Sequence, residues 1–139
     1  MKEDYILTDI ITILTTKIAK IEEEALAESR FSELTGKQMH YLEAISNLNN
    51  PNLGELATEL NLSKPSITAI IDKFEEKEFI RKVKSDEDRR VSHIHMAERG
   101  KEIEKVHSKI HMRISNIFTS KLTKNELKSL INLLSKIVK

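Results

Sequence analysis

The stretch LSKPSITAIIDKF, residues Leu62–Phe74, decides the fold of this chain. Ser63 is a favourable helix N-cap, and Pro65 falls in the first turn, where a proline removes no hydrogen bond. The apolar positions that follow recur at helical spacing: Ile67, Ile70, Ile71 and Phe74. The other face carries small or polar side chains, which leave the backbone free to approach a second surface closely. Such a face suits a helix that enters a DNA major groove.

The segment before this stretch predicts a helix that braces the one starting near Ser63. Its apolar residues lie at positions 53, 56, 57, 60 and 62. Ala57 is small enough for a tight helix crossing, and Asn61 tolerates a tight turn between the two helices. The two helices together predict a helix-turn-helix, in which the first helix supports the second against the duplex.

Two short strands are expected after the second helix. The segments Phe79–Lys84 and Val91–Met96 are predicted to pair, with the charged loop Ser85–Arg90 between them. A hairpin in this position is a wing, so the sequence predicts a winged helix-turn-helix.

The helix-turn-helix is followed by three recognisable segments, Glu76–Ile80, Asp86–Arg90 and the strand end Ala97–Gly100. This order resembles the MarR family of winged-helix transcription regulators, and the resemblance extends over essentially the whole chain. The wing and the segment Phe31–His40 look most like the branch of the family that represses fatty-acid synthesis genes, FabT-like.

This resemblance implies a homodimeric repressor that binds double-stranded DNA at an inverted-repeat operator under the control of a ligand. In the FabT-like branch the effector is an acylated carrier protein, which strengthens DNA binding. Other members are released by small aromatic or cationic compounds, and some respond to zinc, so these effectors stay open as alternatives. The resemblance does not say which genes are regulated.

Two positions depart from the pattern of the family. Ala69 stands where many members have arginine, so no specific operator sequence can be carried over. Glu78 stands where many members have glycine. Because Glu78 must join a helix end to a strand, we expect a modest conformational cost at this position.

Further helices flank the winged lobe. Residues Tyr5–Ser29 contain no glycine or proline, and their apolar stripe is wider than one packing partner would cover. We therefore expect this helix to bury its excess apolar surface against a second copy of the chain, whereas the alternative is a core helix within one chain. A second long helix is expected over Glu98–Leu122, where apolar residues again keep a helical register.

Two capping-box patterns mark the starts of the remaining helices. Thr35 with Gln38 begins a helix over Gly36–Asn47, and Thr123 with Glu126 begins the last helix. We therefore expect six helices and a mainly α fold with a small β-hairpin wing, organised as one MarR-like domain over residues 1–139. The lobe would cover about 35–99, and the helices about 5–29 and 98–138 would form the dimer.

Composition narrows the classes of function. The chain has 139 residues, enough for one core, and it has no cysteine, which excludes disulfides, thiolate metal sites and cysteine-based peroxide sensing. The start of the sequence lacks the pattern of a signal peptide and no stretch is apolar enough to cross a membrane, so we expect a cytoplasmic protein without a membrane partner.

The net charge of +1 conceals an uneven distribution. Residues 1–62 hold 5 basic and 11 acidic side chains, residues 63–101 hold 10 and 8, and residues 102–139 hold 8 and 3. The acidic excess therefore lies away from the reading helix and the wing, and attraction to phosphate would be local. An ordinary solvated helix face explains the acidic cluster near the N-terminus.

Seven residues are candidates for DNA contact. Lys64, Ser66, Thr68 and Lys73 lie on the polar face of the second helix, where hydroxyls and ammonium groups suit phosphates and base edges. Asp88, Arg89 and Arg90 lie at the tip of the wing, where a guanidinium suits the minor groove and Asp86 and Asp88 would orient it. Plain surface residues on the helix and an ordinary charged turn are the alternatives, and the sequence does not separate the two arginines.

Histidines are the other candidates for a site. His107 and His111 are four residues apart on a predicted helix, and His93 and His95 are two apart on a strand, so either pair offers two metal ligands. Because a metal site needs three or four converging ligands, we predict no metal and no cofactor, and these four histidines stay as weak candidates.

Neither a nucleophile elbow, a glycine loop for phosphate nor an HExxH motif occurs in the sequence, so we predict that the chain is not an enzyme. The prediction is a DNA-binding repressor. From another class, the fold could serve as a protein-interaction module that does not read DNA, which the near-neutral charge and Ala69 favour slightly.

Overall fold

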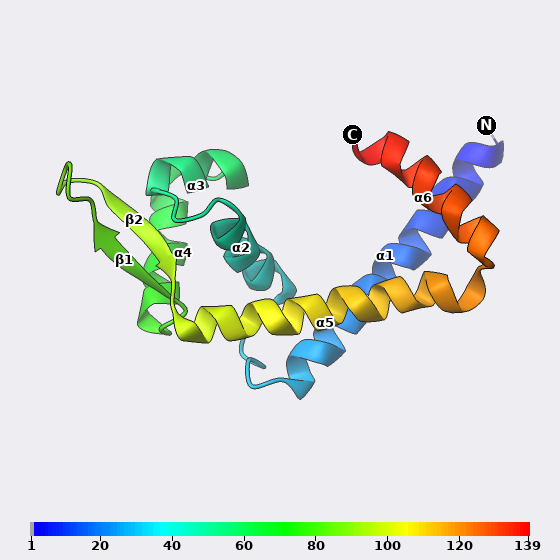
Figure 1. Ribbon diagram of the computed structural model, residues 1–139, viewed down its shortest axis with the longest axis horizontal. Helices are drawn as coiled ribbons and strands as arrows, with labels where there is room; N and C mark the ends of the chain where they lie inside the picture. The colour runs from blue at the N-terminus through cyan, green and yellow to red at the C-terminus, as the bar shows by residue number, and fades with distance from the viewer. Residues whose placement is uncertain (1) are drawn as a thin grey trace. The chain divides into compact units, whose positions relative to one another are not determined.

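The computed structural model describes residues 2–139, as six helices and one two-stranded antiparallel sheet (Figure 1). In chain order the elements are α1 Lys2–Glu28, α2 Gly36–Asn47, α3 Leu53–Leu60, α4 Lys64–Glu76, β1 Ile80–Lys84, β2 Ser92–Met96, α5 Glu98–Lys121 and α6 Lys124–Val138. The predicted fold class, mainly α with a β-hairpin wing and six helices, is confirmed. Over these residues no helix has both the length and the apolar character needed to cross a bilayer.

The chain divides into two compact units. One unit holds residues 26–107, which include α2, α3, α4 and the hairpin, and the other holds the N-terminal part of α1 together with residues 108–139. The long helices α1 and α5 each supply residues to both units.

Helix starts follow from local capping. The predicted capping boxes at Thr35 and Thr123 are both present, with side chain and backbone bonded reciprocally to Gln38 and Glu126. A third capping box, which joins Asn52 to Glu55, begins α3. These boxes satisfy backbone N–H groups that the first helical turn leaves without partners, and they place the helix starts within a residue of the predicted positions.

The turn between α3 and α4 is also a local feature. α3 ends at Asn61, which has a left-handed backbone with φ of 51°, and α4 begins after Ser63, whose hydroxyl accepts a hydrogen bond from the Ser66 N–H. Asparagine tolerates the left-handed region better than most residues, so the predicted turn at Asn61 is confirmed. At the other end of α4, Glu78 has φ of 65°, which confirms the strained position that the sequence indicated.

The core of the 26–107 unit lies between α2, α3, α4, the hairpin and the start of α5. α3 packs against α2 and α4, and β1 packs against α4. Twelve apolar side chains from this unit are almost fully buried at the centre: Phe31, Met39, Leu42, Ile45, Leu56, Ile67, Ile71, Phe74, Phe79, Ile80, Ile94 and Ile103. The hairpin pairs from Ile80 opposite Met96 to Lys84 opposite Ser92. This core holds the exposed face of α4 and the wing at fixed positions on one rigid support.

Arg99 links three segments of the same unit. Its guanidinium donates hydrogen bonds to the Lys77 carbonyl oxygen at 2.6 Å and to Glu33 Oε1 at 2.9 Å, and it lies 4.5 Å from the ring centre of Phe79. Next to it, Gly100 approaches the Phe79 carbonyl so closely that an added Cβ would lie 2.2 Å from that oxygen. The end of α4, the linker before α2 and the start of α5 are therefore joined around one arginine and one glycine.

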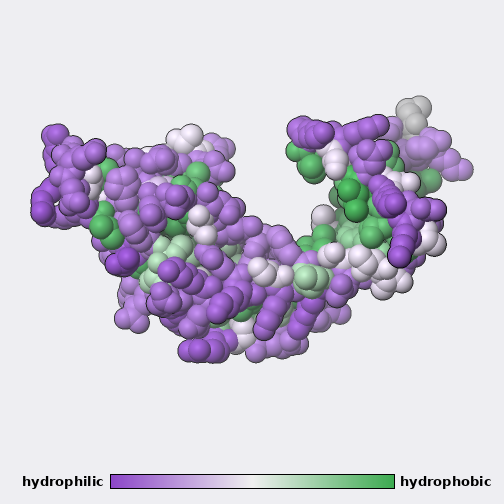
Figure 2. Space-filling view, viewed as in Figure 1, coloured by the Kyte–Doolittle hydropathy of each residue, from purple (hydrophilic) through white to green (hydrophobic). Residues whose placement is uncertain are grey.

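The other unit exposes apolar surface on α1 and α6. Ile10 and Ile13 on α1 are more than half exposed, as are Ile137 and Val138 on α6. Figure 2 shows hydrophobic residues gathered on the surface around α6. Exposed apolar side chains gathered in this way are typical of surfaces that form contacts with another protein.

Candidate nucleic-acid interface

The polar face of α4 points to solvent. Ile67, Ile71 and Phe74 are buried, so the residues between them face outward by helical periodicity. Lys64, Ser66 and Lys73 are exposed, and Thr68 is half-buried. The structure thus leaves the four predicted helix residues on the part of α4 that the core does not cover, with the small Ala69 also exposed there.

The two hydroxyl groups on this face differ in what they offer to a ligand. The Ser63 hydroxyl donates a 2.8 Å hydrogen bond to Ser66 Oγ, which leaves the Ser66 proton available for an acceptor. The Thr68 hydroxyl instead donates to the Lys64 carbonyl oxygen at 2.8 Å. Ser66 is therefore the better donor to a phosphate or a base edge, and Thr68 retains only its acceptor lone pairs.

Salt bridges attach the hairpin to α4. Lys82 of β1 donates to Asp72 Oδ1 at 2.6 Å, and its backbone N–H donates to Glu75 Oε2 at 3.1 Å. Asp72 lies on the outward side of α4, so Lys82 compensates an acidic group beside the candidate reading face. Sequence reasoning had not identified Lys82, because its partners lie seven or more positions away.

The wing loop has a defined conformation around Asp88. Its carboxylate accepts hydrogen bonds from the Arg90 backbone N–H at 3.0 Å, from Nε at 3.1 Å and from Nη2 at 3.2 Å. The Arg90 side chain holds the pKa of Asp88 below its usual value, and the backbone N–H of Arg90 adds to this effect. The carboxylate therefore stays ionised and orients the guanidinium with a two-point contact.

Arg89 and Asp86 are placed differently from this pair. Both side chains are exposed at the wing tip, and across residues 2–139 neither has an ion pair or side-chain hydrogen bond. Of the two acidic residues expected to orient the arginines, Asp88 contacts Arg90 and Asp86 contacts neither. The structure thus separates two arginines that the sequence could not separate.

A surface hollow of about 230 Å³ joins the wing to the helix-turn-helix. It is lined by Asn52, Leu53 and Gly54 at the start of α3, by Lys64 at the start of α4, and by Arg90, Val91 and Ser92 of the wing. Two cationic side chains and the N-terminus of a helix thus meet at one place, which is a favourable arrangement for an anion. The sequence had not indicated Asn52 or Gly54, because their proximity to Arg90 depends on the fold.

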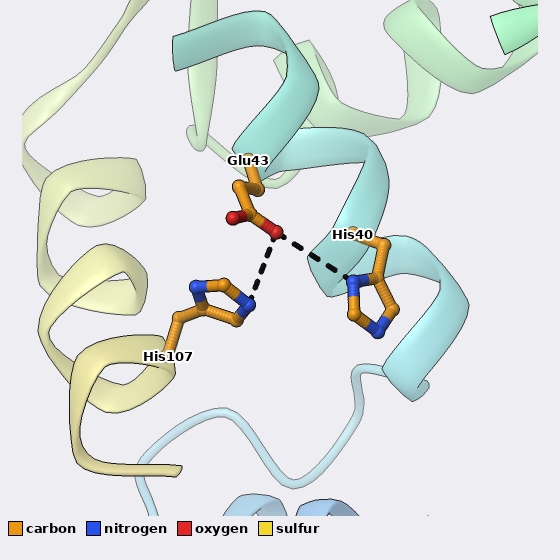
Figure 3. Close-up of side chains that lie close together, drawn as sticks. All are labelled: His40, Glu43 and His107. Carbon is orange, nitrogen blue, oxygen red and sulfur yellow. Dashed lines mark ion pairs between the residues drawn. The ribbon is translucent and has the colours of Figure 1, made fainter. Parts of the chain in front are cut away.

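One of the candidate metal ligands belongs to a cluster. His107 of α5 lies beside Glu43 and His40 of α2, with His107 Nε2 at 3.0 Å and His40 Nδ1 at 3.6 Å from Glu43 Oε2 (Figure 3). In the described part of the chain, His93, His95 and His111 belong to no comparable group of three ligand atoms. His93 instead bonds the Asn50 carbonyl oxygen through Nδ1. Sequence reasoning missed His40 and Glu43, whose spacing of three residues on one helix was the available signal.

Comparisons with known proteins agree with this fold. The sequence model that describes the MarR family matches residues 34–92 of this chain. The chain is 33% identical over 134 residues to the uncharacterized HTH-type transcriptional regulator YpoP of Bacillus subtilis. This alignment covers 94% of this chain and 92% of that protein.

Solved structures have the same fold. The superposition on the crystal structure of Streptococcus pneumoniae FabT in complex with DNA covers 95% of this chain and 92% of the FabT chain, with a TM-score of 0.84 at 24% identity. A mutant of Escherichia coli MarR complexed with operator DNA covers 99% and 96%, with a TM-score of 0.69 at 22% identity. Proteins of this family are transcription regulators and not enzymes, in line with the prediction from the motifs. Since the relative from Bacillus subtilis matches over nearly its whole length, the chain belongs to the MarR family of winged-helix transcriptional regulators.

Proposed function

We propose that the chain is a repressor that binds an inverted-repeat operator as a homodimer. Each subunit places α4 in the major groove and its wing in the adjacent minor groove. The observation that carries this proposal is the hollow in which Lys64, Arg90 and the start of α3 meet, beside the exposed face of α4. Family membership and the DNA-bound FabT and MarR structures support it.

The hollow accommodates one phosphate of the DNA backbone. Lys64 and Arg90 supply positive charge, and the first N–H groups of α3 supply a helix N-terminus. A phosphate held at this point fixes the register of α4 in the major groove, because it joins the first residue of the helix to the wing. Asn52 and Gly54 take part as the cap and first turn of α3.

The exposed residues of α4 divide between phosphates and bases. Lys73 and Ser66 offer donors, whereas Thr68 serves by its position and methyl group. Ala69 allows close approach of the helix but cannot donate a hydrogen bond. The set favours positioning over base recognition, so shape and deformability of the operator contribute to its choice.

The wing inserts an arginine into the minor groove. Asp88 holds the Arg90 guanidinium near the hollow, and Arg89 remains exposed at the tip. We assign Arg90 to the phosphate and Arg89 to the minor groove, where a narrow A-tract deepens the negative potential.

A homodimer supplies the second half-site. The exposed apolar residues of α1 and α6 lie in the same unit, and a second copy of the chain covers them. Homodimers are typical of the family, and a two-fold dimer presents two copies of α4 to half-sites about one helical turn apart.

Selection of bound sequences from random duplex DNA tests the proposal. We expect enrichment of an inverted repeat, and salt-dependent binding of that duplex in fluorescence anisotropy. Arg89→Ala and Arg90→Ala should each weaken binding by about 1–3 kcal/mol at fixed salt. Lys128→Ala on the exposed surface of α6 is the control and should change affinity little. Failure to enrich any duplex would favour the protein-interaction module, and unchanged binding by both arginine variants would remove the wing from the interface.

The effector is a separate part of the proposal. Resemblance to the FabT-like branch supports an acylated carrier protein, bound through its acyl chain and its acidic surface, that strengthens operator binding. Operator affinity measured with and without long-chain acyl carrier protein tests this, with the carrier lacking an acyl chain as the control. No difference between the two carrier forms would leave release by a small aromatic compound as the alternative.

A further inference from the structure

We propose that His40, Glu43 and His107 form a binding site for one divalent transition-metal ion, and that Zn²⁺ is the ion it suits. The three side chains come from α2 and from the first half of α5, within the 26–107 unit (Figure 3). Each directs one ligand atom toward the others: a ring nitrogen from each histidine and Oε2 from the glutamate. This site is distinct from the DNA-contact residues and does not depend on the proposed function.

The separations between ligand atoms fit a small metal ion. The three atoms lie within 4.8 Å of one another, with 3.0 Å from His107 Nε2 to Glu43 Oε2 and 3.6 Å from His40 Nδ1 to the same oxygen. In a tetrahedral zinc site with bonds of about 2.0–2.2 Å, neighbouring ligand atoms lie roughly 3.3 Å apart. The two distances to Glu43 Oε2 therefore lie on either side of the spacing that a tetrahedral zinc site requires. A small rotation of the exposed His40 side chain would bring its ring nitrogen to the required distance from His107 Nε2.

The chemistry of the ligands narrows the class of ion. Two imidazoles and one carboxylate form the donor set of many catalytic and regulatory zinc sites, whereas Mg²⁺ and Ca²⁺ prefer oxygen ligands alone. The absence of cysteine also removes thiolate competition for the ion elsewhere in the chain. Three protein ligands leave one position for water.

Burial is graded across the site in a way that allows entry of an ion. The side chain of His107 is 11% exposed, that of Glu43 35% and that of His40 48%. The ion thus has a fixed, largely desolvated ligand at the bottom and an open side toward solvent. Desolvation around His107 strengthens the attraction between the cation and the Glu43 carboxylate.

The metal joins helices that are far apart in the sequence. His40 and Glu43 lie on one face of α2, and His107 lies 64 residues after Glu43 on α5. Without a metal, His107 Nε2 lies 3.0 Å from Glu43 Oε2; a bound metal ion would bridge these two atoms. Metal binding therefore clamps the helix that precedes the helix-turn-helix to the helix that follows the wing.

Titration of metal-free full-length protein with ZnCl₂ tests the site. We expect binding of one Zn²⁺ per chain by calorimetry, a raised melting temperature that EDTA reverses, and no response to MgCl₂. Co²⁺ should give the strong visible absorption of a tetrahedral site. His40→Asn and Glu43→Gln should each weaken Zn²⁺ binding by about 100-fold or more, since changes at residues that only hydrogen-bond a metal ligand already cost about 10–100-fold.

Two controls keep the result interpretable. His95→Asn removes a histidine outside the cluster and should leave Zn²⁺ affinity within about twofold, and circular dichroism verifies that each variant is folded. His40 is exposed, so its replacement tests the site even where a change of the buried His107 unfolds the chain. Zn²⁺ affinity equal in the parent, His40→Asn and Glu43→Gln, or no saturable binding by the folded parent, would overturn the proposal.

Discussion

Glu78 has a backbone conformation that glycine would adopt more easily than glutamate. Its φ of 65° lies in the left-handed region, where a Cβ is unfavourable, and it directly follows the C-cap of α4. The Phe79 N–H donates to the Phe74 carbonyl oxygen at 2.9 Å across this residue, so the conformation closes the helix end.

Glu78→Gly should therefore stabilise the protein by about 0.5–1 kcal/mol, because removal of the left-handed strain exceeds the added entropy of the unfolded glycine. Urea denaturation measures the difference. Glu76→Gly, at the last residue of α4, is the control and should not stabilise the protein, because this position has no left-handed backbone strain to relieve. A loss of stability in Glu78→Gly would mean that the carboxylate makes a contact that outweighs the strain.

His95 gives the stability a dependence on pH. Partial burial lowers the pKa of His95 first of all, and the neighbouring positive charges of Arg81 and His93 lower it further. The unfolded chain thus binds a proton at higher pH than the folded chain. The contribution to stability is full above the unfolded pKa of about 6.5 and is lost as the pH falls through the folded pKa.

We expect the free energy of unfolding to decline on acidification below about pH 6.5, and His95→Asn to make that decline shallower. Chemical denaturation at a series of pH values measures both slopes. Identical pH profiles for the parent and the variant would show that other groups govern acid sensitivity.

At the scale of elements, the crossing of α5 over the start of the hairpin depends on Gly100. A methyl group there would lie 2.2 Å from the Phe79 carbonyl oxygen and 2.7 Å from Met96 Cε. The methionine side chain can move, but the carbonyl belongs to the backbone and also accepts a 3.0 Å hydrogen bond from the Ala97 N–H.

Gly100→Ala should therefore destabilise the protein by about 1–3 kcal/mol, as overpacking does in a close contact. Gly54→Ala is the matched control, because its new methyl group would lie 3.4 Å from Asn52 Oδ1 at an ordinary distance, and alanine favours the helix. Thermal denaturation of the two variants compares them. Equal stability would mean that α5 shifts without cost.

In the wing, the effect of orienting Arg90 on DNA binding can be measured separately from the effect of the acidic charge. Asp88→Asn and Asp86→Asn each remove one negative charge near the DNA, but Asp88 alone bonds Arg90. The charge effect on DNA affinity is then similar in both variants, and the difference between them reports the loss of orientation.

We expect Asp88→Asn to bind the selected operator about two- to fivefold more weakly than Asp86→Asn, because an exposed ion pair contributes only modestly. Fluorescence anisotropy at one salt concentration measures the ratio. Equal affinities would show that the contact between Asp88 and Arg90 does not pre-organise the arginine.

At the scale of the whole molecule, association follows from the surface that one chain leaves exposed. Ile10 and Ile13 of α1 are 54% and 57% exposed, although they are isoleucines in a regular helix. A charged residue at either position is incompatible with a dry interface, because an unpaired buried charge is costly.

Ile13→Glu should therefore shift the protein from dimer to monomer in light scattering and weaken operator binding with it, since each subunit of the proposed dimer contacts one half-site. Thr12→Glu, one residue away on another face of α1, is the control and should stay dimeric. A monomeric parent, or a dimer that survives Ile13→Glu unchanged, would place the subunit interface elsewhere.

The sequence by itself determined the local architecture. Helix periodicity, the caps at Thr35, Ser63 and Thr123, the turn at Asn61 and the strained Glu78 were all predictable, because each depends on residues within a few positions of one another. The same local patterns identified the winged helix-turn-helix and the exposed side of α4.

Only the tertiary structure decided which distant residues meet. The cluster of His40, Glu43 and His107 joins α2 to α5, and the hollow brings Lys64 to Arg90. From the sequence, His107 was paired with His111 as a candidate metal ligand, because the spacing of residues along one helix or strand can be read from a sequence. Contacts between elements are not, since they depend on how the buried side chains pack against one another and so fix the direction in which each polar residue points.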